Sequence, residues 1–165
     1  MRAAYAFDGP LRDAIHRYKY QSEYARASSL SELLIEAIER TEFEAGDGWD
    51  RIAYVPLHPR RRRQRGFDQS RLLAERLAER IGVPWTAGLV RSVDTPSQVG
   101  QGAIERRLNV RDAFAWTGER LDGLRLLIVD DVFTTGATMI AASQPLIHAG
   151  AERVDGLAVA REILR

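Results

Sequence analysis

The sequence contains no cysteine, so its residues can form neither a disulfide nor a zinc site built on thiolates. Its formal net charge is only +1, which excludes a nucleic-acid-binding polycation as a description of the whole chain. No apolar run approaches the roughly 20 residues of a membrane-spanning helix, and the N-terminus lacks a signal-peptide pattern. We therefore expect a cytoplasmic protein with no membrane partner, folded as one domain over residues 1–165.

Short apolar runs alternate with helical patterns along the chain, which predicts an α/β fold. The expected strands are 3–7, 52–56, 89–90, 113–116, 126–129 and 154–160. The expected helices are one that begins near Pro10, then 25–40, 68–81 and 139–148. Such alternation predicts a mostly parallel twisted sheet with helices on both faces.

The stretch 126–138 combines an expected buried strand, two acids, a small hydroxyl-rich loop and the start of a helix. A phosphate is favoured on the amides of such a loop and at the helix start. Asp130 and Asp131 would repel a phosphate but suit sugar hydroxyls or a divalent cation. The residues expected to hold the phosphate are Thr134, Thr135, Gly136, Ala137 and Thr138. A capped helix start is the alternative, because Asp and Thr are good N-cap residues.

A dense cluster of arginine follows the expected strand that ends at Pro56. Five of the six residues 60–65 are arginine, and guanidinium groups bind phosphate oxygens in a bidentate way. We expect a loop over 57–67, with one or two arginines on a diphosphate and the others in solvent or against a polyanion. A solvated basic face and a nucleic-acid patch are the alternatives.

Two motifs resemble known families. The string 126–138 resembles the phosphoribosyl pyrophosphate (PRPP) signature of type I phosphoribosyltransferases, in which two acids precede Thr-Thr-Gly-x-Thr. The segments 55–61 and 65–69 resemble the hallmark of the ComF competence-protein family, where Asn is usual at the position of Asp68. We expect Asp68 to cap the helix that follows. Members of that family commonly carry an N-terminal zinc module rich in cysteine, which we expect to be absent here.

The resemblance implies transfer of phosphoribosyl from PRPP with release of diphosphate and with Mg²⁺ as cofactor. Asp130 and Asp131 would hold the ribose hydroxyls, and the metal through water or ribose. The residues implied for the diphosphate are Leu57, His58, Arg60 and Arg61. Residues 92–109 would close over the site as a lid, with Arg106 or Arg107 on the departing diphosphate; an ordinary surface loop is the alternative.

Three functions stay open at this level. The chain is a phosphoribosyltransferase with an unidentified acceptor, a PRPP-binding module without turnover, or an accessory module in DNA uptake that docks to single-stranded DNA or a competence helicase. A homodimer is compatible with each. Lys19 is expected at a solvated helix end, with contact to a ligand from the N-terminal region as the alternative. A diphosphate loop that binds through its backbone does not need the His58 imidazole.

Overall fold

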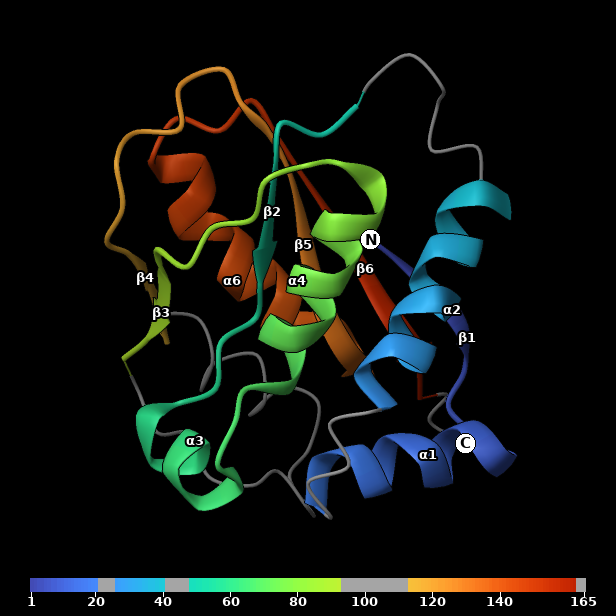
Figure 1. Cartoon of the computed structure of the whole chain (residues 1–165). Coiled ribbons are helices and arrows are strands. Elements are labelled where there is room, and N and C mark those ends of the chain that lie inside the picture. Colours follow the sequence, from blue (N-terminus) through green and yellow to red (C-terminus); the bar gives the residue numbers. More distant parts are fainter. Residues whose placement is uncertain (21–25, 41–47, 93–112, 163–165) are drawn as a thin grey trace.

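A four-stranded parallel sheet forms the centre of the computed structural model, which describes residues 1–20, 26–40, 48–92 and 113–162 (Figure 1). The strand order is β1-β6-β5-β2, with bounds β1 Arg2–Ala6, β2 Arg51–Tyr54, β5 Arg125–Phe133 and β6 Arg153–Arg161. A separate antiparallel pair consists of β3 Leu89–Arg91 and β4 Phe114–Trp116. The architecture is the α/β class predicted from the sequence.

Helices cover both faces of this sheet. Their bounds are α1 Gly9–Tyr20, α2 Arg26–Arg40, α3 Pro59–Arg65, α4 Gln69–Ile81 and α6 Ala137–His148. Leu127 and Val129 of β5 belong to one core with α1, α2 and α4, whereas Leu126 and Ile128 belong to a second core with α6 and the β3–β4 pair. Alternate side chains of β5 thus serve opposite faces. Among the helices described, none is long and apolar enough to cross a membrane.

Strand β5 is longer than predicted. The ladder with β6 continues past the acidic pair, with Val132 opposite Ala160 and Phe133 opposite Arg161. Asp130 and Asp131 therefore lie inside the strand, and the prediction that the strand ends with them was wrong. The reason is the partner strand, because β6 runs far enough to pair with two further residues of β5.

The segment 57–67 contains helix α3, so the prediction of a loop there was wrong. His58 is the N-cap residue, and its Nδ1 accepts a hydrogen bond from the Arg60 amide at 3.4 Å. Pro59 suits the first turn, and Gly66 ends the helix in the left-handed conformation at φ 80°. Helix α4 begins directly afterwards with Asp68 as its N-cap, as the sequence predicts.

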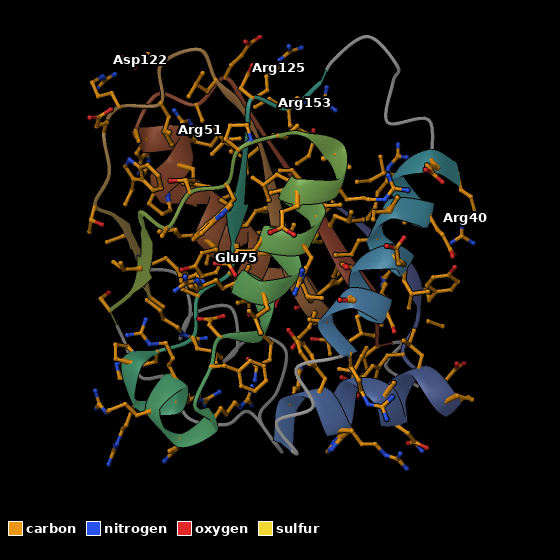
Figure 2. All side chains as sticks on the ribbon, viewed as in Figure 1. Arg40, Arg51, Glu75, Asp122, Arg125 and Arg153 are labelled. Carbon is orange, nitrogen blue, oxygen red and sulfur yellow. The ribbon has the colours of Figure 1, made fainter. Side chains whose placement is uncertain are left out.

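Three arginines mark the end of the sheet that lies opposite α1 and α3. Figure 2 shows Arg51, Arg125 and Arg153 gathered at the amino ends of β2, β5 and β6. Arg125 pairs with Asp50 and Arg153 with Asp155. Helices α1 and α3 flank the carboxyl end of the sheet instead (Figure 1), where parallel α/β sheets usually bind ligands.

Candidate functional site

Asp130 and Asp131 lie near the carboxyl end of β5, where two helices supply their partners. The Oδ1 atom of Asp130 accepts a hydrogen bond from Ser70 Oγ of α4 at 2.8 Å and another from the Asp131 amide at 2.8 Å. The Oδ1 atom of Asp131 lies 2.9 Å from Lys19 Nζ of α1. The side chain of Asp131 is 8% exposed and that of Lys19 is 20% exposed. The acidic pair is therefore held from both helices by its Oδ1 atoms.

Burial governs the charge of Asp130. It raises the pKa of Asp130 from its ordinary value of 3.8 to about 7, and the neighbouring charge of Asp131 acts in the same direction. The ammonium of Lys19 and the hydroxyl of Ser70 oppose that rise. A carboxyl of this kind can exchange hydrogen bonds with a neutral hydroxyl group at neutral pH, which suits a sugar diol.

The five residues predicted to hold a phosphate form the turn after β5 and the first turn of α6. Gly136 is the N-cap residue at φ 79°, and a Cβ atom there would collide with the side chain of Met1. Thr135 Oγ1 accepts a hydrogen bond from the Ala137 amide at 3.4 Å. Helix α6 has no acidic residue in its first turn. Its amino end is therefore electrostatically suited to an anion.

The residues predicted to hold a diphosphate lie beside the carboxyl end of β2. The Leu57 amide donates a hydrogen bond to Asp68 Oδ2 at 2.8 Å, so Asp68 ties this segment to the start of α4. Arg60 and Arg61 lie in the first turn of α3, the former exposed and the latter half-buried. In this arrangement the Leu57 amide is already engaged, and the two guanidinium groups are better suited to meet an anion.

Helix α1 reaches the site, which the sequence offered only as the alternative to a solvated helix end. The expectation that Lys19 lies at a solvated helix end was wrong, because its ammonium pairs with Asp131. Tyr18, fully buried, fixes this end of α1 by donating a hydrogen bond from its hydroxyl to the Gln69 carbonyl at 2.8 Å. One signal was present in the sequence, since Lys19 is the only lysine in the chain.

Arg106 and Arg107 lie outside the described residues, as does nearly all of the predicted lid 92–109. Ser92 follows β3 and is the one described residue of that segment. Its amide donates a hydrogen bond to the Ala113 carbonyl at 2.9 Å. The described residues on either side of 93–112 are therefore hydrogen-bonded to each other, and the roles of Arg106 and Arg107 stay predictions.

The acidic pair does not have the composition of a protein-held magnesium site. Within the described ranges, no group of three or more His, Cys, Asp or Glu side chains could hold a metal ion. One of the two available acids already faces the Lys19 ammonium. Octahedral Mg²⁺ is commonly held by one or two carboxylates together with water and substrate phosphates. The residues present do not fit direct ligation by the protein alone.

Comparison with known sequences identifies the family of this chain. Residues 68–162 match the family model described as phosphoribosyl transferase domain. The chain is 36% identical over 151 residues to DNA utilization protein YhgH of Salmonella typhi, a match that covers 88% of this chain and 64% of that protein. It is 32% identical over 159 residues to competence protein F of Haemophilus influenzae, covering 92% of this chain and 68% of that protein.

The chain belongs to the phosphoribosyl transferase domain family and, within it, to the ComF family. It spans about 64% of the length of YhgH, the first of these relatives. The fold is also similar to that of glutamine PRPP amidotransferase from B. subtilis, with a TM-score of 0.53 and 21% identity. That match covers 85% of this chain and 29% of the amidotransferase.

Proposed function

We propose that this protein binds PRPP and transfers its phosphoribosyl group to an acceptor that remains to be identified, with release of diphosphate. One observation carries the proposal: the acidic pair of β5 lies a few residues before an anion-compatible turn at the start of α6. The turn suits the 5′-phosphate and the carboxyls suit the ribose diol. Membership of the phosphoribosyl transferase domain family supports the same ligand.

In the proposed reaction, the bond between C1 of the ribose and a diphosphate oxygen breaks, and a bond from the acceptor to C1 forms. Asp130 and Asp131 would orient the ribose through its hydroxyls and stabilise positive charge near C1. Arg60 and Arg61 would bind the leaving diphosphate as cations, joined by Arg106 or Arg107. We propose Mg²⁺ as an ion that enters with the diphosphate, because no group of three or more His, Cys, Asp or Glu side chains in the described residues could hold it without the substrate.

Isothermal titration calorimetry with PRPP and Mg²⁺ tests the binding step. We expect one site per chain, with a dissociation constant below millimolar, and loss of that binding in an Asp130→Asn, Asp131→Asn double variant. Asp122→Asn is the matched control, because this exposed acid pairs with Arg120 in the turn before β5. Failure of the wild-type protein to bind at millimolar PRPP would end the proposal.

Turnover separates an enzyme from a silent ligand-binding module. Diphosphate release should be measured with PRPP and a panel of nucleobases, amines and ammonia, because the sequence does not identify the acceptor. Release that depends on one acceptor and on the acidic pair supports transfer. PRPP binding without release from any member of the panel favours the alternative, a catalytically silent module.

A second candidate function is nucleic-acid binding by helix α3. This helix presents five arginines and buries none of its residues. Arg62 and Arg63 also line a pocket of about 520 Å³ against the first turns of α4. Two relatives are named for DNA utilization and for competence, which supports single-stranded DNA or a competence helicase as the partner.

A gel-shift titration with single-stranded DNA tests this second function. Replacement of Arg61 and Arg62 by Ala should weaken binding and lower the slope of log affinity against log salt by roughly 0.7 for each phosphate that is no longer neutralised. The control removes two exposed arginines of α4, Arg76 and Arg80, and should leave the slope unchanged. Equal weakening in both variants would indicate a nonspecific charge effect.

A homodimer and a cytoplasmic location stay predictions from the sequence.

A further inference from the structure

The chain uses lysine once, at the candidate site. Of its 24 Lys and Arg residues, Lys19 is the only lysine, and the other 23 are arginine. Its Nζ atom lies 2.9 Å from Asp131 Oδ1, and its side chain is 20% exposed. A position where any cation would serve would be expected to carry arginine in a chain of this composition.

The position of Lys19 is fixed by its neighbour in α1. Tyr18 is fully buried, donates a hydrogen bond to the Gln69 carbonyl, and packs its ring against Phe67 with centroids 5.4 Å apart. Gln69 and Phe67 lie at the start of α4 and just before it. The packed end of α1 therefore places the Lys19 ammonium beside Asp131. Arg17, two residues earlier, is exposed instead.

The difference between lysine and arginine matters at this carboxylate. An ammonium is a compact charge that approaches one carboxylate oxygen, whereas a guanidinium binds both oxygens as a fork. The contacts of the acidic pair with Lys19, Ser70 and the Asp131 amide all use Oδ1 atoms. Lysine therefore leaves Oδ2 of Asp131 open to a ligand hydroxyl, and arginine in its place would cover that atom.

We propose that Lys19 is a positioning residue that supplies the fixed counter-charge of the acidic pair, keeps Asp131 Oδ2 for a ligand hydroxyl, and keeps divalent cations off both acids. The identity of the hydroxyl as part of a ribose diol rests on the proposed function. The exclusion of divalent cations does not rest on the proposed function, because it follows from the position of the Lys19 ammonium beside two carboxyls. Besides burial, the charge of Asp131 raises the pKa of Asp68, the N-cap of α4, and the pKa of Tyr18 in α1, so both groups lie within its electrostatic reach.

The first experiment compares ribose 5-phosphate with inorganic phosphate by calorimetry in EDTA. The wild-type protein should bind the sugar phosphate about tenfold more tightly, the value of one charge-assisted hydrogen bond. Lys19→Met and Lys19→Arg should both lose most of that ratio and keep their affinity for phosphate. Arg17→Met should keep the ratio. A wild-type ratio in Lys19→Arg would overturn the proposal, because a role of charge alone would survive that change.

The second experiment measures Mn²⁺ binding without any sugar, by electron paramagnetic resonance. Lys19→Met should acquire a Mn²⁺ site that a further Asp131→Asn change removes, whereas wild-type and Lys19→Arg proteins should lack it. If a folded Lys19→Met protein lacks this Mn²⁺ site, the proposal is overturned. If circular dichroism shows that Lys19→Met does not fold, a Mn²⁺ site at Asp131 in the wild-type protein would overturn the proposal. The comparison of ribose 5-phosphate with phosphate is then decided by Lys19→Arg alone. If wild-type protein binds no ribose 5-phosphate, the proposed function fails, and Mn²⁺ binding still decides the role of Lys19.

Discussion

The buried hydroxyl of Tyr18 provides a quantitative test of how α1 docks at the site. It is fully buried and donates to the Gln69 carbonyl at 2.8 Å. Tyr18→Phe removes this hydrogen bond and leaves the rest of the ring in place. The variant loses the net free energy of one hydrogen bond and leaves a buried carbonyl without this donor. Together these effects should lower the free energy of unfolding by about 1–2 kcal/mol. For a chain of this length that corresponds to a fall of about 3–6 °C in Tm.

Urea unfolding followed by circular dichroism measures this loss. Burial raises the pKa of Tyr18, so the hydroxyl stays protonated and the loss should be equal at neutral and mildly alkaline pH. Tyr5→Phe is the matched control, because the Tyr5 hydroxyl bonds Glu36 on the exposed surface and water can replace that interaction. A Tyr18→Phe protein as stable as the wild type would refute the described docking of α1.

Variants at three further positions test other parts of the site. Burial raises the pKa of Asp130 to about 7, so its ionisation costs the folded state free energy as pH rises from about 4 to about 7. Asp130→Asn should therefore raise the stability of the ligand-free protein at pH 8, and this increase should disappear near pH 4 in urea titrations. Gly136→Ala places a Cβ at φ 79° against Met1 and should cost about 1–2 kcal/mol with weaker phosphate binding by calorimetry. Asp68→Ala removes the acceptor of two backbone amides and should cost about 2–3 kcal/mol in urea titrations, more than Asp68→Asn, which keeps one acceptor.

Local patterns were sufficient to predict most of the fold. The helix over 69–81 has an apolar stripe, an Asp cap at its start and a glycine at its end, so each feature predicts the same element. The local features of 126–138 also agree with one another, because a continuous apolar run precedes the acids and predicts a buried strand before the turn. Both the α/β class and the place of the acidic pair at the carboxyl end of the sheet follow from these patterns.

The wrong predictions from the sequence concern features that depend on helix caps or on contacts between residues distant in the sequence. Helix α3 has no apolar stripe, and its ends depend on His58 and Gly66, so periodicity gave no signal for it. The length of β5 depends on its pairing with β6. The role of Lys19 depends on how α1 packs against the start of α4, and no local rule in the sequence reports that packing. The composition did offer a signal, because a single lysine among 23 arginines is unusual.

The central claim is that the turn after β5 binds a phosphate while the acids of β5 bind the diol of the same sugar. A crystal structure of the protein grown with PRPP and Mg²⁺ tests it most directly. The account predicts the 5′-phosphate on the amides of residues 135–138, and the ribose 2- and 3-hydroxyls within hydrogen-bond distance of Asp130 and Asp131. A ligand bound elsewhere, or one whose ribose turns away from both acids, would contradict it.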